Sequence, residues 1–401
     1  MLVAAVAVGF LGWWGLREYQ FRQSRKAAED ALAKYDFPAA RTRLSECMGW
    51  RPGDPEIRLL AAQAARRDGA FDEAQDQLIR YREIAGLTEP WRLESSLQSV
   101  AAGQIESEVK YLMTLADTRH PAAEQILETL ALGSVESYRF DRAGFWVSQL
   151  LKHFPQNPVG RLLTAQNLVL RGRHDQAASL CREILADNPR FLKVRTYLAD
   201  ILYKAQKYEE GVEAYRELLA LRPGEAEPLL GLAQCLERLG RTDEARPLMA
   251  ELEARHAGDS EVLLECGQFA VKEGRLADAE RLLRRANQIA PNDHEIHFQL
   301  GRCLELLGRL DESRYHLDEF KRIEADLRRM ELLLAEIAKD PGDPSPRREV
   351  GTICLRNGQT QEGLRWLNGV LETHPGDPAT LRLLATYAPK IGSPVAGNTG
   401  R

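Results

Sequence analysis

Two histidines are the side chains best suited to bind a metal ion. His294 and His297 stand one helical turn apart, with Glu295 beside them. Imidazole and carboxylate groups are zinc ligands, but a zinc site takes at least three of them from the protein. No third ligand is evident at a suitable spacing. We therefore predict histidines that are packed or solvated, and no metal.

The six cysteines could in principle carry metal or redox chemistry. None forms a Cys-x-x-Cys pair, so neither a zinc site nor a thioredoxin-type redox site is indicated. We predict that they lie mostly on buried helix faces, where a thiol packs as a small hydrophobic group. Burial as free thiols fits a reducing compartment. The residues are Cys47, Cys181, Cys235, Cys266, Cys303 and Cys354.

Motifs of common enzyme classes do not occur in the chain. There is no phosphate-binding Gly-x-x-x-x-Gly-Lys-Ser/Thr, no Gly-x-Ser-x-Gly and no dinucleotide fingerprint. The 54 basic and 59 acidic residues give a net charge of −5, which argues against a broadly cationic nucleic-acid protein. We predict no enzymatic activity, no cofactor and no nucleic-acid partner.

A period of 34 residues organises the chain. Prolines recur at this interval, with Ala257 in one slot and a single longer step of 50 residues before Pro341. The prolines of the series are Pro121, Pro155, Pro189, Pro223, Pro291, Pro341 and Pro375. Such a fixed period predicts a repeat protein with one supersecondary unit per repeat.

Each period contains two apolar faces with helical spacing. One column of small residues includes Ala199, Ala233 and Gly267, and a second includes Gly211 and Ala245. Small residues allow two helices to approach closely. Glycines fall between the columns, where a first helix must end with a positive φ; they are Gly172, Gly240, Gly274, Gly308 and Gly358. We expect Asp175, Asp243 and Asp311 to accept from free backbone donors of the second helix.

This pattern resembles the tetratricopeptide repeat, on residues such as Pro223, Gly231-Leu232-Ala233 and Ala245. The resemblance implies an all-α, right-handed superhelical solenoid of antiparallel helix pairs. It would cover residues 21–389, as ten repeats and a closing helix at about 378–389. The weakest matches are repeats 21–54, where Tyr35 replaces the glycine, and 90–123, where Val109 occupies the small column. The tail 390–401 is expected to be disordered.

Ten consecutive repeats are expected, and the second, 55–89, carries one inserted residue. Each repeat should bury its faces only against its neighbours, so the chain should form one solenoid. The repeats are 21–54, 55–89, 90–123, 124–157, 158–191, 192–225, 226–259, 260–293, 294 to about 343, and 344–377.

The N-terminus resembles a membrane anchor. Residues 2–16 carry no charge, and Arg17, Arg22, Arg25 and Lys26 follow. Fifteen helical residues span about 22 Å, which is short of a ~30 Å hydrocarbon core. We predict an uncleaved anchor over residues 1–20 with the remainder in the cytoplasm. The alternatives are a cleaved signal peptide, a start assigned at the wrong residue, or a periplasmic or other extracytoplasmic location.

The long interval before Pro341 predicts one helix at about 311–339. Its apolar residues follow an a/d spacing over more than two heptads; they are Phe320, Ile323, Leu327, Met330, Leu334 and Ile337. Two roles remain open. The seam packs inside the solenoid, or the helix overhangs and supports self-association or partner docking.

The resemblance also implies a concave groove lined by the first helix of each repeat. The fifth and ninth residues of a repeat share one helix face, and several such pairs join a leucine to a glutamine. A row that alternates apolar and amide groups suits an extended or helical peptide. The alternative is that the leucines fill the space between repeats. The predicted groove residues are Leu162, Gln166, Tyr197, Asp200, Tyr203, Leu230, Gln234, Leu264, Gln268, Phe298 and Arg302.

These observations predict a non-enzymatic, membrane-tethered scaffold that binds protein partners in its concave groove. Two further functions are compatible with the same residues. The solenoid could be the regulatory or substrate-recruiting subunit of a separate enzyme, or a structural spacer at the cell envelope.

Overall fold

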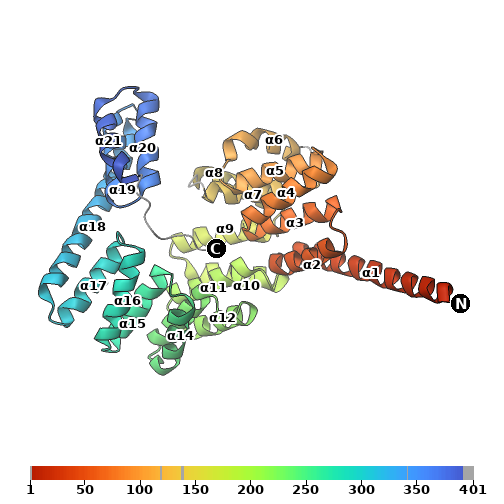
Figure 1. Cartoon of the computed structure of the whole chain (residues 1–401), viewed down its shortest axis with the longest axis horizontal. Helices are drawn as coiled ribbons and strands as arrows, with labels where there is room; N and C mark the ends of the chain where they lie inside the picture. The colour runs from red at the N-terminus through yellow and green to blue at the C-terminus, as the bar shows by residue number, and fades with distance from the viewer. Residues whose placement is uncertain (1, 118–119, 137–139, 341, 392–401) are drawn as a thin grey trace. The chain divides into compact units, whose positions relative to one another are not determined.

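The computed structural model describes residues 2–117, 120–136, 140–340 and 342–391, and over these ranges the chain forms 21 helices and no strand. The helices divide into two compact units, Met1–Arg241 and Thr242–Arg401. Within each unit the helices mainly contact those that are adjacent in sequence (Figure 1). The predicted all-α fold of stacked helix pairs is confirmed.

Unit 1, Met1–Arg241, contains the first thirteen helices. They are α1 (Leu2–Ala33), α2 (Phe37–Trp50), α3 (Pro55–Asp68), α4 (Phe71–Ala85), α5 (Glu89–Ala101), α6 (Ile105–Asp117), α7 (Ala123–Glu136), α8 (Phe140–His153), α9 (Pro158–Leu170), α10 (His174–Asp187), α11 (Leu192–Lys204), α12 (Tyr208–Leu221) and α13 (Ala226–Arg238).

Unit 2, Thr242–Arg401, contains the remaining helices. They are α14 (Thr242–Arg255), α15 (Ser260–Lys272), α16 (Leu276–Ile289), α17 (His294–Leu306), α18 (Leu310–Lys339), α19 (Pro344–Arg356), α20 (Thr360–Thr373) and α21 (Pro378–Ile391). The boundary between the units therefore lies inside the repeat expected at 226–259. Most of the expected tail, residues 392–401, lies outside the described part of the chain.

Where the structure describes the turn inside a pair, its backbone has the conformation that the glycines predict. All five predicted glycines have φ between 72° and 76°. Gly69 and Gly103 occupy the same slot in earlier repeats, with φ of 88° and 91°. Tyr35 and Gln206 stand in this slot with φ of 57° and 60°, a conformation that side-chain-bearing residues rarely adopt.

The small columns lie where two consecutive helices come closest. A Cβ on Gly231 would stand 2.2 Å from Cζ of Tyr215, and one on Gly267 would stand 2.7 Å from Cγ of Leu283. These glycines therefore leave the space that the large side chain of the neighbouring helix fills. The six cysteines are all free and buried, as their helical positions predicted.

The capping residues differ from the prediction. α10 begins at His174, so Asp175 is already its second residue and bonds to Lys207 Nζ at 2.5 Å instead of capping the helix. No side-chain cap is made by Arg173 or Arg309, the N-cap residues of α10 and α18. Asp36 caps a second helix, α2, by accepting from the Ala39 amide at 3.3 Å. On first helices a carboxylate, amide or hydroxyl accepts from the first turn; these caps include Asp54, Thr88, Asn157, Asp259, Asp293 and Asp343.

The N-terminal apolar run does not form a separate element. It continues into α1, whose exposed residues include Trp14 and Tyr19, and this part of α1 extends away from the rest of unit 1 (Figure 1). Among the described helices, none combines the length and the apolar character that crossing a bilayer requires. This finding does not support the predicted anchor over residues 1–20.

The long helix α18 buries part of the predicted seam: Ile323 is buried, and Met330 and Ile337 pack against the core around Leu333. Ile323 and Leu333 are 3% and 0% exposed, whereas Leu327 and Leu334 are 39% and 46% exposed. Leu333 packs with Val350 and other residues of α19 in a small core at this end of unit 2. Asp326 and Leu333 take the places of Leu327 and Leu334 on the buried face, and Arg356 Nε donates to the Asp326 carboxylate at 2.9 Å.

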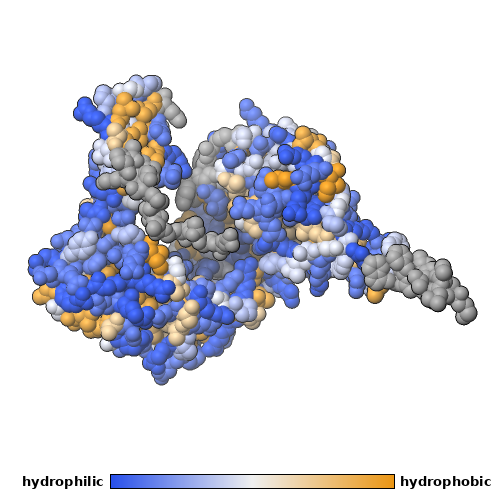
Figure 2. Space-filling view, in the orientation of Figure 1, coloured by the Kyte–Doolittle hydropathy of each residue, from blue (hydrophilic) through white to orange (hydrophobic). Residues whose placement is uncertain are grey.

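The surface of unit 2 is mainly polar on the face drawn in Figure 2, where blue side chains cover most of its helices. Hydrophobic side chains gather over α20 and α21 in this view. Leu381 of α21 is 47% exposed.

Candidate functional site

Two adjoining hollows in unit 1 form the candidate site. Their volumes are about 660 and 410 Å³, and they share five lining residues from α3, α7, α9 and α11. The shared residues are Asp68, Leu132, Glu136, Leu162 and Lys193. Because these residues belong to both, the two hollows form one groove, which we call the unit 1 groove.

Small residues open the larger hollow. Ala101, Ala102 and Gly103 line it at the end of α5, and Gly133 lines it on α7. A Cβ on Gly133 would stand 2.6 Å from the backbone oxygen of Val100. The close approach of α7 to α5 therefore depends on a residue without a side chain.

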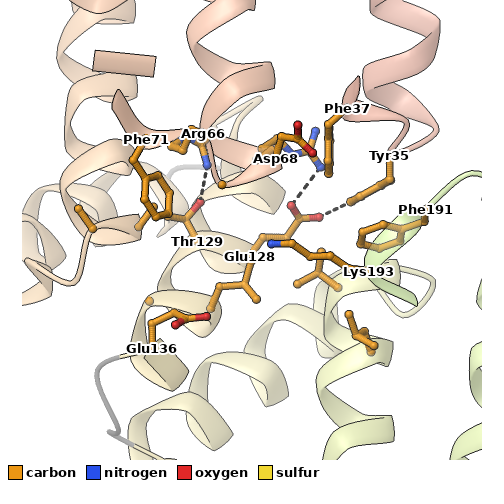
Figure 3. Close-up of a pocket in the computed structure, with 18 of the residues that line it drawn as sticks. Tyr35, Phe37, Arg66, Asp68, Phe71, Glu128, Thr129, Glu136, Phe191 and Lys193 are labelled. Atoms are coloured by element: carbon orange, nitrogen blue, oxygen red, sulfur yellow. Dashed lines mark hydrogen bonds and ion pairs between the residues drawn. The ribbon is translucent and has the colours of Figure 1, made fainter. Parts of the chain in front are cut away.

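The turn between α1 and α2 forms one wall of the larger hollow. Tyr35 and Phe37 lie there against Phe191, which precedes α11, with ring centroids 4.9 and 6.2 Å from that of Phe191 (Figure 3). The guanidinium of Arg67 lies over both rings of the turn, 4.5 Å from Tyr35 and 4.8 Å from Phe37. The first repeat thus contacts residues more than 150 positions further along the chain.

Glu128 on α7 holds this wall together. It is 4% exposed and accepts from the Tyr35 hydroxyl (Figure 3), from the Asn157 amide and from Arg67 Nη2 at 3.2 Å. Burial, and after it the Glu128 carboxylate, raise the pKa of Tyr35, so its hydroxyl keeps the proton that it donates.

Other charges on the walls are also paired inside unit 1. Arg66 lies 2.6 Å from the Glu94 carboxylate and donates to Thr129 Oγ1 at 3.1 Å. Asp68 accepts from Arg41 at 2.5 Å. A buried charge is tolerated when it has a partner and hydrogen bonds, so these groups are already satisfied without a ligand.

Glu136 and Lys193 are different. Both are exposed and both line the two hollows. Among the described residues, neither side chain makes a hydrogen bond or an ion pair. In Figure 3 Lys193 reaches into the larger hollow, and Glu136 lies on the other side of it.

The smaller hollow contains four of the predicted groove residues. Leu162 and Gln166 line it from α9, and Tyr197 and Asp200 line it from α11. Asp200 accepts from the Tyr215 hydroxyl at 2.8 Å. Burial raises the pKa of Asp200, although the Tyr215 bond opposes part of that rise. Burial also raises the pKa of Tyr197 to about 12.

The other predicted residues of unit 1 lie outside the two hollows. Tyr203 packs on Tyr208 with ring centroids 5.7 Å apart. Leu230 and Gln234 lie part-buried on α13, and Gln234 has a polar partner. Sequence reasoning also missed the contributions of Tyr35, Glu128 and Glu136, because no periodic position marks them.

The predicted groove residues of unit 2 pack largely against their own unit. Leu264 is 7% exposed, and Gln268 is part-buried. Phe298 lies 5.1 Å from Phe320 of α18, centroid to centroid. The guanidinium of Arg302 lies 5.8 Å from the centre of the Phe298 ring.

The histidine pair is also part of the packing of unit 2. His297 Nδ1 lies 2.9 Å from His316 Nδ1, and His297 Nε2 lies 3.0 Å from the Pro291 carbonyl. His294 stacks on Phe320. In the described ranges no group of three or more His, Cys, Asp or Glu side chains could hold a metal ion.

The groove can bind a ligand by apolar burial supported by a few polar groups. A ligand site is typically a concavity of roughly 300–1,000 Å³ with mostly apolar walls and few polar groups that fix orientation. The larger hollow fits this description, because Phe71, Leu132, Val159 and Leu162 line it beside the polar groups described above. Fold and site together define a helical-repeat protein with a groove across several repeats.

The repeats are tetratricopeptide repeats. The family model described as "Tetratricopeptide repeat" matches residues 31–97, 202–264 and 270–337. A second model, "Anaphase-promoting complex, cyclosome, subunit 3", matches residues 136–218. No curated protein matches the sequence of the chain.

Several solved structures are similar to the chain at low identity. Yeast Tom70 is 11% identical with a TM-score of 0.45, over 92% of this chain and 88% of its own. The human IFIT1 dimer with m7Gppp-AAAA is 14% identical with a TM-score of 0.41, over 80% and 90%. MamA (41-end) from Desulfovibrio magneticus RS-1 is 16% identical with a TM-score of 0.37, over 41% and 93%.

Proposed function

We propose that the chain is a non-enzymatic scaffold whose unit 1 groove binds a segment of a partner protein. The observation that carries this proposal is the joining of two hollows by shared residues from four helices. Four of the residues predicted from sequence alone line the groove, and they come from consecutive repeats. A partner segment would therefore contact several repeats at once.

The composition of the walls favours a polypeptide. Leu162 and Leu132 offer apolar contact, and Gln166 and Thr196 offer amide and hydroxyl groups nearby. An amide can both donate to and accept from a peptide backbone, so it suits a ligand that repeats these groups along its length. Apolar side chains of the partner would supply most of the affinity by leaving water.

The test compares capture of partners by groove variants of the full chain. Gln166→Ala with Tyr197→Ala removes polar and aromatic contacts of the smaller hollow, and we expect markedly weaker capture. Partners would be identified by cross-linking and mass spectrometry on the wild-type chain. If an enzyme is among these partners, the result would favour the alternative in which the solenoid is a regulatory or substrate-recruiting subunit of that enzyme.

Two controls keep this test specific. Asn167→Ala changes an amide on the same helix that is exposed and lines neither hollow. Leu230→Ala with Gln234→Ala changes two predicted residues outside the hollows. Both controls should retain helicity and capture. Unchanged capture by the Gln166 and Tyr197 variant would refute the assignment of the groove.

Membrane contact through residues 2–16 is a separate prediction. Flotation of the full chain with phospholipid vesicles, beside a chain without these residues, measures it. Equal flotation of the two chains would contradict the prediction, because residues 2–16 would then add no affinity for the bilayer.

A further inference from the structure

The exposed charges Glu136 and Lys193 hold a special position in the unit 1 groove. They line both hollows, so they stand where the two join. The other charges named on the walls of the larger hollow, Arg66, Arg67 and Asp68, are neutralised by carboxylates or guanidinium groups of unit 1. Among the described residues, Glu136 and Lys193 have no such partner.

Each of these two charges also opposes the dipole of its own helix. Glu136 is the last residue of α7, where the partial charge of the helix is negative. Lys193 is the second residue of α11, where the partial charge is positive. Neither charge is therefore favoured by its local structure. Residues that break a local rule without a compensating contact are often those that serve function.

The walls near these charges are apolar. Leu132 and Leu162 line both hollows, and Phe71 and Val159 line the larger one. A bulky apolar side chain of a ligand placed there would displace water from the space between Glu136 and Lys193. Less water strengthens an ion pair with a ligand charge and makes a like charge more costly.

We propose that Glu136 and Lys193 select partner segments in which a bulky apolar side chain lies between a basic and an acidic residue. The apolar side chain enters the larger hollow, the basic residue pairs with Glu136, and the acidic residue pairs with Lys193. The two pairs fix the direction in which the segment lies in the groove. This selectivity rests on the proposed function of the groove.

The experiment selects ligands for the full chain from a phage library of random dodecapeptides. The selection is repeated on a charge-exchanged variant, Glu136→Lys with Lys193→Glu. The wild type should enrich peptides with an acidic and a basic residue in one order around an apolar centre. The exchanged variant should enrich the opposite order. A peptide selected on the wild type should bind the exchanged variant about tenfold more weakly.

A matched control exchanges two exposed charges outside the hollows. Glu209→Lys with Lys110→Glu carries the same change in charge, and neither residue lines the groove. This control should enrich the same peptides as the wild type. A neutral variant, Glu136→Gln with Lys193→Gln, should enrich peptides that keep the apolar centre but show no preferred order of charges.

The outcomes separate this inference from the proposed function. If the wild type and the exchanged variant enrich the same charge pattern, or apolar peptides without one, the selectivity is wrong although the groove binds peptides. If no version of the chain enriches any peptide, both the selectivity and the peptide-binding function are overturned.

Discussion

Tyr35 shows how a single residue can contradict its local pattern and still stabilise the fold. Its slot holds glycine in most repeats, since the backbone there has a positive φ. Tyr35 nevertheless adopts φ of 57° and is 8% exposed, with its ring against Phe37 and Phe191. The contacts of the side chain offset a backbone conformation that costs roughly 1–2 kcal/mol for a residue with a Cβ.

We expect opposite effects from glycine at the two non-glycine turn positions. Tyr35→Gly relieves the backbone but removes the ring contacts and the donor to Glu128, so the free energy of unfolding should fall by about 2–4 kcal/mol. Gln206→Gly removes the same backbone strain at an exposed residue, so the free energy of unfolding should rise by up to about 1 kcal/mol. Urea unfolding measures both. Shifts of the same sign would contradict the role of the Tyr35 side chain.

The buried pair His297 and His316 predicts sensitivity to acid. The Pro291 carbonyl accepts from His297 Nε2, so His297 Nδ1 is left to accept from His316 Nδ1. Burial, followed by His297 and Arg284, lowers the pKa of His316 to about 4. An unfolded histidine titrates near pH 6.5.

Because the folded pKa of His316 is lowered, the unfolded chain binds more protons between pH 6.5 and 4. The contribution of His316 to the free energy of unfolding is fully present above about pH 6.5 and falls as the pH is lowered through that window. At pH 5 the loss should be about 2 kcal/mol relative to pH 7.5. Urea unfolding at the two pH values checks it. His316→Gln should lose less unfolding free energy than the wild type between pH 7.5 and pH 5. His153→Gln changes an exposed histidine and should lose as much as the wild type.

Helix pairs depend on glycine where a neighbouring side chain needs the space. Gly267→Ala places a Cβ 2.7 Å from Cγ of Leu283, so we expect a loss of about 1–3 kcal/mol in unfolding free energy. Gly369→Ala changes a helical glycine of unit 2 with no atom within 4 Å, and should add about 0.5–1 kcal/mol through helix propensity. Thermal unfolding of both variants tests this, and a stabilising Gly267→Ala would contradict it.

The exposed side of α18 carries the prediction of self-association. Leu327 and Leu334 lie seven residues apart on this side and are 39% and 46% exposed. We expect Leu327→Glu with Leu334→Glu to abolish a concentration-dependent dimer in sedimentation velocity. Leu332→Glu adds a charge at a leucine that is 60% exposed on another face and should leave the dimer intact. A wild-type chain that is monomeric at every concentration would contradict the prediction of self-association.

At the scale of elements, periodicity predicts helices and turns well and predicts the buried face of α18 only in part. The 34-residue period places each pair because every repeat needs the same small residues and turn. The buried face of α18 includes Asp326, which a search for apolar spacing passes over. Its carboxylate accepts from Arg322 of the same helix and from Arg356, which reaches it only after α19 has packed on α18.

At the scale of the molecule, unit 1 has contacts that a nearest-neighbour stack lacks. The Tyr35 hydroxyl donates to Glu128, 93 residues away, and Arg190 pairs with Asp36 at 3.4 Å across 154 residues. Such contacts result from the curvature of the stack, which is the sum of small rotations at each repeat. No single repeat encodes that sum. The sequence therefore predicted the groove residues of α9 and α11 but not the wall formed by the first repeat.

The division into two units predicts that the groove survives without the second. Every residue that lines the two hollows precedes Arg241, as do the Glu128 contacts and the main core of unit 1. We expect a fragment of residues 1–241 to be helical, to unfold cooperatively and to capture the partners of the full chain. Fragment 242–401 should be helical and capture none of them. Circular dichroism and pull-down measure both. If fragment 1–241 folded but captured nothing, the partner site would have to include residues of unit 2, and the assignment of function to the unit 1 groove would fail.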